Sequence, residues 1–348
     1  MSRILLVTIE LAGRSGTEIV TFETAHGLQR RGHEVAIYTL RLGSLGNAVS
    51  EKFPVFRHIE LLTWRPDLIQ ANHTYPLINA TARFPDVPVF SICHDATAWF
   101  NEPLHLPTIR KQAAVSLACR DRIVQKIPKL AGRVELLHNA VDLESFHARA
   151  SLPSRPKRAL ILSNHVIHAP GVRSACTEAG LDVDLLGPGV GRVVDDLPSR
   201  LLGYDLVFAT GRMALEAMAV GCAVIVVDGR GLAGMVTSDA VSSWRDHNFG
   251  LWLLKRPIVM ADIAVEIDRY DAVDAGRVSE FIRRHSSLSG YIDRLEAIYQ
   301  SLITDSAADP LNSTALTAAL GKSFRSLLSA MERQIEAQRN PRDGSSKM

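Results

Sequence analysis

The chain has 348 residues, of which 47% are hydrophobic and 22% charged, and its formal net charge is +2. The composition is that of an ordinary globular protein, and the length predicts two domains of about 100 to 200 residues each. Lys and Arg are spread along the chain, so the charge pattern argues against a nucleic-acid partner. The cysteines are far apart and form no C-x-x-C pair, so their spacing indicates neither a zinc site nor a disulfide framework.

The amino-terminal sequence MSRILLVTIELAGRSG contains an apolar run of only six residues before a glycine turn. This run is too short for a signal-peptide core or a membrane span, so we interpret it as a β-strand and expect a cytoplasmic protein. Further short apolar runs, such as HEVAIYTL, PDLIQAN and PVFSICH, alternate with helical patterns. The alternation predicts a doubly wound, parallel α/β domain over residues 1–150.

A second α/β series follows a break in this pattern. Residues 147–158, HARASLPSRPKR, are rich in Pro, Ser and basic residues and predict a linker. The runs RALILSN, DVDLLG, YDLVFA and CAVIVVD then alternate with helical segments, which predicts a second domain of the same kind over residues 151–305, closed by one or two helices. The expected fold class is therefore α/β, with two tandem Rossmann-like domains facing across a cleft and a helical extension at 306–348.

The extension combines an apolar pattern with a polar end. Apolar residues recur at three- and four-residue steps between 311 and 335, which predicts an amphipathic helix, and the last residues are polar enough to be disordered. We expect the apolar stripe to pack back on its own chain. The alternatives are a homodimer, or peripheral membrane contact with Lys322, Arg325 and Arg333 near anionic head groups. The stripe consists of Leu316, Leu320, Phe324, Leu327, Leu328, Met331 and Ile335.

One glycine-rich turn in the first domain suits an anionic ligand. In LAGRSGTE, Gly13 and Gly16 let the backbone approach a ligand, and the amides at the start of the next helix attract anions. The turn lacks the G-x-G-x-x-G fingerprint, and no acidic residue ends the second strand to hold a ribose. A nicotinamide or flavin enzyme is therefore not expected.

The segment GRMALEAMAVGCAVIVVDGRG, residues 211–231, is nearly all apolar but contains Glu216. A carboxylate on a buried helix needs an internal polar partner or a position facing a cleft. Thr210 is a plausible helix cap, so Glu216 is expected in the first turns of the helix, where it could accept two hydrogen bonds from a ribose. The DGRG turn at 228–231 could present amides to phosphate or sugar at the same edge of the sheet.

These segments resemble the donor-binding part of GT-B fold glycosyltransferases, in particular family 4. LEAMAVGCAVIVVDGRGLAGMV is similar to the family pattern LEAMA.G.PVI..D.GG..E.V, and SGTEIVTFETAHGLQRRGHEVAIYT, RPDLIQANHTYP, ICHDA and LLHNAVDLESF match further motifs in the right order. The likeness covers about residues 3–303. It implies transfer of a hexose, with retention of configuration, from a nucleotide diphosphate sugar to a glycan or lipid-linked acceptor. It implies no metal ion and no cofactor besides this co-substrate.

The resemblance also implies roles for individual residues. Glu216 would bind the donor ribose, and His94 would act as the catalytic residue near the donor sugar. The family's Arg and Lys that bind the diphosphate do not follow RALILSN here, so Arg173 and Arg212 are the candidate cationic donors. The family's second carboxylate, eight positions before Glu216, is replaced by Phe208. The other donor-binding candidates are Gly16 and Thr17 by the phosphates, and Gly229 and Gly231 around the diphosphate and sugar.

The Phe208 replacement leaves other functions open. A nucleotide-sugar epimerase of the same double fold would process the donor without an acceptor, and a catalytically silent protein of this fold would bind nucleotide without turnover. His165 and His168 lack a third ligand at a recognisable spacing, which argues against a metal site. We expect a protein that is cytoplasmic, or peripheral at the inner face of the membrane if the extension contacts lipid.

Overall fold

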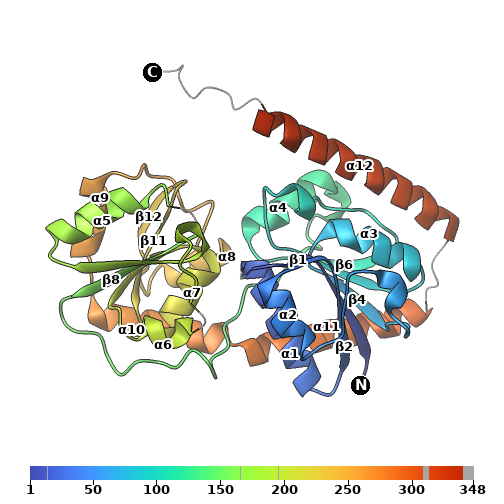
Figure 1. Cartoon of the computed structure of the whole chain (residues 1–348), viewed down its shortest axis with the longest axis horizontal. Helices are drawn as coiled ribbons and strands as arrows, with labels where there is room; N and C mark the ends of the chain where they lie inside the picture. The colour runs from blue at the N-terminus through green and yellow to red at the C-terminus, as the bar shows by residue number, and fades with distance from the viewer. Residues whose placement is uncertain (14, 165, 195, 309–312, 340–348) are drawn as a thin grey trace. The chain divides into compact units, whose positions relative to one another are not determined.

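The structure, a computed structural model, describes residues 1–13, 15–164, 166–194, 196–308 and 313–339. The chain divides into two compact units, each with its own β-sheet (Figure 1). The first unit comprises residues 1–114, 119–136 and 294–348, and the second comprises residues 115–118 and 137–293.

The first unit is built on a sheet of seven strands. The strands are β1 (Arg3–Leu11), β2 (Glu34–Leu42), β3 (Val55–Phe56), β4 (Leu68–Ala71), β5 (Val89–Cys93), β6 (Ile109–Ala114) and β7 (Glu135–Leu136). They pair in parallel in the order β3-β2-β1-β4-β5-β6-β7. Residues 4–7 of β1 are fully buried, as expected for a strand with helices on both faces of its sheet. This order places the carboxyl ends of β1, β4 and β5 next to one another.

Helices connect these strands and cover the sheet (Figure 1). They are α1 (Gly16–Arg30), α2 (Ser44–Ser50), α3 (Thr74–Arg83) and α4 (Leu117–Lys126), with short 3-10 turns η1 (Ile59–Leu61), η2 (Trp99–Asn101) and η3 (Pro128–Leu130). The predicted doubly wound α/β domain is therefore confirmed for this part of the chain.

The helix α11 (Leu288–Ala308) corrects the expected division of the chain. The sequence pattern predicts a second domain that extends to residue 305, but α11 enters the first unit at residue 294. There the Glu296 carboxylate lies 2.9 Å from Nε2 of His33, and the Tyr299 ring packs against Phe90 of β5 with centroids 6.3 Å apart. These contacts join residues more than 200 positions apart, so no local pattern could reveal them.

The second unit has a five-stranded sheet in the order β12-β11-β10-β8-β9. Its strands are β8 (Arg158–Leu162), β9 (Asp182–Leu186), β10 (Leu206–Ala209), β11 (Ala223–Asp228) and β12 (Gly231–Met235). All pairs are parallel except β11 with β12, which form an antiparallel hairpin at the edge. Along β11, Val224 and Val226 enter one core cluster while Ile225 and Val227 enter another. Both faces of this strand are therefore covered, as the all-apolar run CAVIVVD predicts.

The helices of the second unit complete a Rossmann-like domain. They are α5 (Ala169–Glu178), α6 (Leu197–Leu201), α7 (Gly211–Val220), α8 (Val241–Asp246), α9 (Met260–Asp268) and α10 (Ala272–His285), with the 3-10 turn η4 (Pro188–Val190). Residues 214–220 of α7 are all buried. Gly221, at a φ of 101°, ends α7 in the left-handed conformation that glycine adopts without strain. The predicted helix and its glycine cap are confirmed.

The carboxy-terminal extension forms α12 (Ser313–Arg339), which packs on α3 and η2 of its own unit. The predicted apolar stripe is divided by this packing. Leu316 and Leu327 are buried, whereas Phe324, Leu328 and Ile335 are 49%, 43% and 44% exposed. The expectation that the stripe packs back on its own chain therefore holds for one side of the helix. The tail predicted to be disordered falls largely at 340–348, outside the described residues. No helix in the described part of the chain is long and apolar enough to cross a membrane.

Candidate functional site

In the first unit, two histidines lie at the carboxyl ends of adjacent strands. His73 follows β4, and its Nδ1 accepts a hydrogen bond from the backbone N–H of Ile9 at 3.1 Å and lies 2.9 Å from Oγ1 of Thr8. Because an amide N–H can only donate, Nδ1 is unprotonated and the ring proton is on Nε2. Burial lowers the pKa of His73 to about 3, and the neighbouring His94 acts in the same direction. His73 is therefore a neutral, fixed part of the strand ends.

His94, the predicted catalytic residue, follows β5 and is partly buried. Its Nε2 lies 3.2 Å from Oδ1 of Asn72. Burial lowers the pKa of His94 to about 4, although the negative charge of Asp95 opposes this shift. At neutral pH, His94 can therefore make hydrogen bonds to a ligand but carries no charge with which to neutralise a phosphate.

The amides of the glycine-rich turn before α1 bind a carboxylate of the chain itself. The Glu18 carboxylate accepts hydrogen bonds from the backbone N–H groups of Ala12, Gly13 and Ser15, at 2.5, 2.9 and 2.7 Å. The turn was expected to approach a ligand, but its own amides before α1 already donate to the Glu18 side chain. The sequence reasoning missed Glu18, although Ser15 and Glu18 have the S-x-x-E spacing of a capping box.

Gly16 and Thr17 begin α1, directly after this turn. Gly16 is exposed, and among the described residues no atom besides those of its chain neighbours and its own helix backbone lies within 4 Å of the position that a Cβ would take. Thr17 is partly buried. A ligand can therefore reach the first turn of α1, where backbone amides and the helix dipole favour an anion.

In the second unit, the structure brings two predicted residues, Glu216 and Arg212, into direct contact on α7. The Arg212 Nε donates a hydrogen bond to Glu216 Oε1 at 2.7 Å, and the Arg212 Nη1 donates to the backbone carbonyl of Ala140 at 3.2 Å. Both side chains are buried. Burial raises the pKa of Glu216, while the charge and hydrogen bond of Arg212 oppose the shift. The carboxylate on this apolar helix therefore has an internal partner, and Arg212 is not an exposed phosphate ligand.

The predicted DGRG turn forms the hairpin between β11 and β12. The buried Asp228 carboxylate accepts hydrogen bonds from the Arg230 N–H at 2.8 Å and from the Arg230 Nε at 3.1 Å, so this amide faces its own chain. Burial alone would raise the pKa of Asp228, but the hydrogen bonds and charge of Arg230 hold it below its usual value. At Gly229, a Cβ would lie 2.3 Å from Cγ2 of Ile167.

Gly231 is required by backbone packing rather than by a ligand. Its φ is +155°, and a Cβ there would lie 2.7 Å from the carbonyl oxygen of Leu254 and 2.8 Å from that of Arg256. Two backbone oxygens at this distance leave no room for a side chain. The presence of glycine at this position is therefore no evidence by itself for a diphosphate or sugar.

Arg173 and Phe208 lie in different surroundings. Arg173 is exposed on α5, a different helix from the α7 that carries Arg212 and Glu216. Phe208 is fully buried in the core between β10 and its neighbours. The Phe208 side chain contributes to apolar packing, so it does not supply the hydrogen-bond acceptor that the family's second carboxylate would provide.

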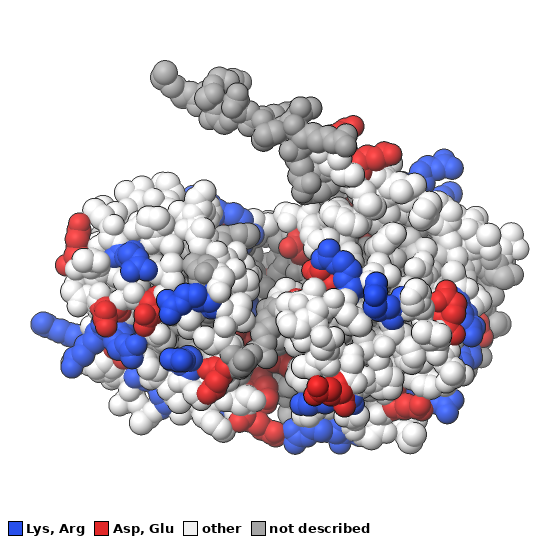
Figure 2. All heavy atoms as spheres, in the orientation of Figure 1, with Lys and Arg blue, Asp and Glu red and all other residues white. Residues whose placement is uncertain are grey.

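The histidines and the surface charges bear on metal and polyanion binding. His165 lies outside the described residues, and the buried His168 begins the first turn of α5. Within the described ranges, no group of three or more His, Cys, Asp or Glu side chains is arranged to hold a metal ion. On the face shown in Figure 2, basic and acidic side chains of the described residues are interspersed on each unit. That face has no broad basic surface of the kind that binds a nucleic-acid backbone.

Comparisons with known proteins agree with this architecture. Residues 14–145 match the model of Glycosyltransferase Family 4. A glycosyltransferase from Rickettsia africae ESF-5 superposes with a TM-score of 0.55 at 14% identity, covering 87% of this chain and 98% of that chain. An alpha-glucosyltransferase solved with UDP and a 13-mer DNA gives 0.54 at 10% identity, covering 86% and 99%. The glycotransferase of kitacinnamycin gives 0.51 at 14% identity, covering 85% and 98%. No curated protein matches the chain in sequence.

At these identities, the solved structures establish the fold, which is the two-domain GT-B fold with a helical extension. The match over residues 14–145 covers most of the first domain and supplies the enzyme class. The resemblance drawn from the motifs is therefore confirmed: the protein is a GT-B glycosyltransferase that resembles family 4.

Proposed function

We propose that the protein is a retaining, metal-independent hexosyltransferase that uses a nucleotide diphosphate sugar and a glycan or lipid-linked acceptor. The observation that carries the donor assignment is the buried Glu216–Arg212 pair of α7. A carboxylate has about four lone-pair positions, and the Arg212 Nε uses one of them. The others can accept hydrogen bonds from ribose hydroxyls, while Arg212 orients Glu216 and favours its charged form against the effect of burial. Retention and the absence of a metal ion follow from the resemblance to family 4.

The proposal also assigns roles to residues of the first unit. Gly16 and Thr17, at the open start of α1, bind donor phosphates through the helix N-terminus. His94 is uncharged at neutral pH, so it orients a sugar hydroxyl through a hydrogen bond and leaves charge stabilisation of the departing diphosphate to amides and to Arg173. Gly229 and Gly231 shape the hairpin beside the donor.

The test is a ligand screen followed by a turnover assay. A panel of UDP-, GDP- and ADP-hexoses is added at saturating concentration, and the cognate donor should stabilise the protein by about 2.7 kcal/mol at a hundred times its Kd. The cognate donor should then release nucleoside diphosphate only when an acceptor is present. Donor conversion without acceptor would identify an epimerase, and binding without any turnover would identify a silent binding protein, for which Phe208 in the core is the supporting observation.

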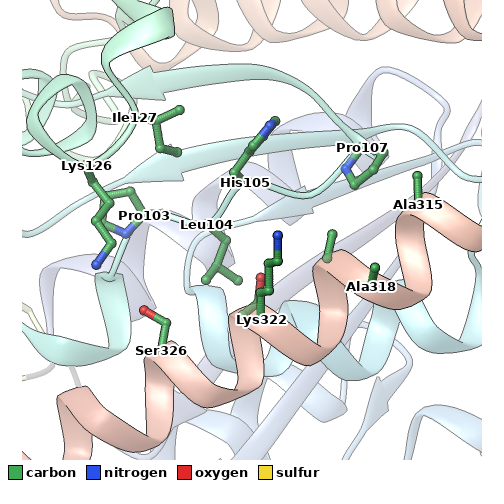
Figure 3. Close-up of a pocket in the computed structure, with 12 residues that line it drawn as sticks. Pro103, Leu104, His105, Pro107, Lys126, Ile127, Ala315, Ala318, Lys322 and Ser326 are labelled. Carbon is green, nitrogen blue, oxygen red and sulfur yellow. The ribbon is translucent and has the colours of Figure 1, made fainter.

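We further propose that α12 places the enzyme on an anionic membrane surface that carries the acceptor. Two adjoining cavities of about 370 and 610 Å³ lie along α12 and share Lys126, Ala318, Lys322 and Ser326. Together they form what we call the α12 groove. One end is lined by apolar residues of the segment 103–107 and by alanines of α12, and Lys126 and Lys322 border it (Figure 3). Arg325 and Arg333 line the other end.

This mixture of an apolar wall and basic residues suits lipid head groups, and the exposed Phe324, Leu328 and Ile335 add apolar surface on the same helix. Charge reversal by Lys322→Glu with Arg325→Glu should abolish sedimentation with phosphatidylglycerol vesicles. The matched control Arg277→Glu, an exposed charge on α10, should leave it unchanged. Equal sedimentation of all three proteins would contradict membrane contact through α12, and a monomer–dimer change in light scattering would instead support pairing of two copies.

A further inference from the structure

A chain of buried hydrogen bonds connects the first turn of α1 to His94. The Thr21 hydroxyl donates to the backbone carbonyl of Thr17 at 2.8 Å, and the Asn72 Nδ2 lies 2.8 Å from the Thr21 Oγ1. The Asn72 Oδ1 then faces the His94 Nε2 at 3.2 Å and the Gln70 Nε2 at 3.0 Å. Thr21, Gln70 and Asn72 have no exposed surface. Two predicted site residues, Thr17 and His94, are therefore joined through the interior of the first unit.

The carbonyl at one end determines the direction of every hydrogen bond in this chain. The Thr17 carbonyl can only accept, so the single hydroxyl hydrogen of Thr21 points to it. The Thr21 oxygen must then accept from Asn72, so the NH₂ group of Asn72 faces Thr21 and its Oδ1 faces His94. Because Oδ1 can only accept, the His94 Nε2 must carry the ring proton.

The other partner of the Asn72 Oδ1 supports the same orientation. The Gln70 NH₂ group donates to the Asn72 Oδ1, and the Gln70 Oε1 accepts a hydrogen bond from the hydroxyl of Tyr299 on α11. A reversed Asn72 amide would place two NH₂ groups against each other unless Gln70 reversed as well. It would also leave Thr21 facing two acceptors with one hydrogen. Burial makes an unmade hydrogen bond costly, so the network holds one arrangement.

We propose that Asn72 is a positioning residue that holds His94 in the Nε2–H form, so that the His94 Nδ1 lone pair accepts a hydrogen bond from a hydroxyl of the sugar. The inference rests on the proposed function, because it assigns His94 to sugar recognition. The fixed tautomer also predicts which sugar substituent His94 prefers. An Nδ1 acceptor favours a hexose with a hydroxyl at the contacted carbon and disfavours a carboxylate or a fluorine there, since neither can donate.

The tautomer itself can be measured without any activity. In ¹⁵N-histidine-labelled protein, long-range proton–nitrogen spectra distinguish an Nε2–H ring from an Nδ1–H ring, and His94→Gln assigns the signal. The wild type should show Nε2–H for His94. Asn72→Leu should produce a mixture of both tautomers. Asn72→Asp loses the donor to Thr21 but keeps an acceptor facing His94, so it should retain Nε2–H. Gln112→Leu removes another buried amide of the same sheet, one that donates to the Leu104 carbonyl, and should change nothing.

The second readout is discrimination between donors. The affinity for the nucleotide sugar that stabilises the protein most in the screen is compared with the affinities for its deoxy and fluoro analogues. The wild type should prefer the hydroxyl-bearing donor over the analogue changed at the contacted carbon by about tenfold. Asn72→Leu should lose most of this preference, and Asn72→Asp should keep more of it. An Nδ1–H signal in the wild type, or an unchanged tautomer in Asn72→Leu, would overturn the positioning role. A correct tautomer with no discrimination would overturn the sugar contact of His94 and leave donor binding by Glu216 intact.

Discussion

The buried pair on α7 allows the binding role of Glu216 to be separated from its structural role. Glu216→Gln alone removes the carboxylate that pairs with the Arg212 guanidinium, and the two side chains are only 8% and 7% exposed. Removal of one partner of a buried ion pair costs about 3 to 5 kcal/mol of stability. Replacing both residues, with Arg212→Met and Glu216→Gln, removes both charges. The Ala140 carbonyl then loses its donor, so a cost of about 1 to 3 kcal/mol remains.

Two measurements on the same four proteins resolve these roles. Urea unfolding gives the free energy of unfolding of the wild type, each single variant and the double variant. Calorimetry gives their Kd for the nucleotide sugar selected by the screen. If Glu216 accepts ribose hydroxyls, the double variant regains stability relative to Glu216→Gln but still binds donor about 10- to 150-fold more weakly. This corresponds to about 1.5 to 3 kcal/mol for hydrogen bonds to a charged group.

A second buried carboxylate of the same unit provides the control. Glu266 lies in contact with Arg256 at 2.6 Å and Arg269 at 3.0 Å, on α9 rather than α7. Glu266→Gln should lower stability without changing donor affinity. A double variant at 212 and 216 that binds donor within twofold of wild type would refute the ribose assignment and leave Glu216 only as the partner of Arg212. A Glu216→Gln protein as stable as the wild type would refute the electrostatic reasoning.

Three further predictions concern the first unit and the mechanism. Glu18→Gln should lower the free energy of unfolding, measured in urea, by about 1 to 3 kcal/mol, because an NH₂ group cannot accept hydrogen bonds from the turn amides. An unchanged free energy would contradict the structural role of the Glu18 carboxylate in this turn. Because the native pKa values of His73 and His94 are lowered to about 3 and 4, the unfolded chain binds more protons below pH 6.5. Each histidine therefore lowers the free energy of unfolding by up to about 1.4 kcal/mol per pH unit as the pH falls from 6.5. His94→Gln should reduce the loss of this free energy between pH 7 and 5, and a loss identical to that of the wild type would contradict the lowered pKa of His94. Transferase activity should survive EDTA, and activity lost in EDTA and restored by manganese would contradict the metal-independent mechanism.

The amino-acid sequence by itself determined the elements of this protein and the class of its fold. The uninterrupted apolar run CAVIVVD predicts a strand covered on both faces, and β11 alternates between two core clusters as a result. Gly221 marks the end of α7 because only a residue without Cβ takes its φ of 101° without strain. These properties depend on neighbours within a few residues, so the spacing along the chain contains them. The motifs also place Glu216 within the first turns of a buried helix, and it lies on α7 five residues after Gly211.

Which side chains meet depends on how the whole chain folds. Arg212 faces Glu216 and the Ala140 carbonyl instead of a ligand, and Gly231 is required by the carbonyls of Leu254 and Arg256. The contact of Asn72 with His94 arises because β4 and β5 are adjacent in the sheet. Only the contact between residues 212 and 216 is visible in the local sequence, because the two residues are one helical step apart. The other contacts join residues separated by tens of positions, which strand order and helix packing bring together. Periodicity specifies which face of an element is buried, whereas the partner that covers that face depends on the whole chain.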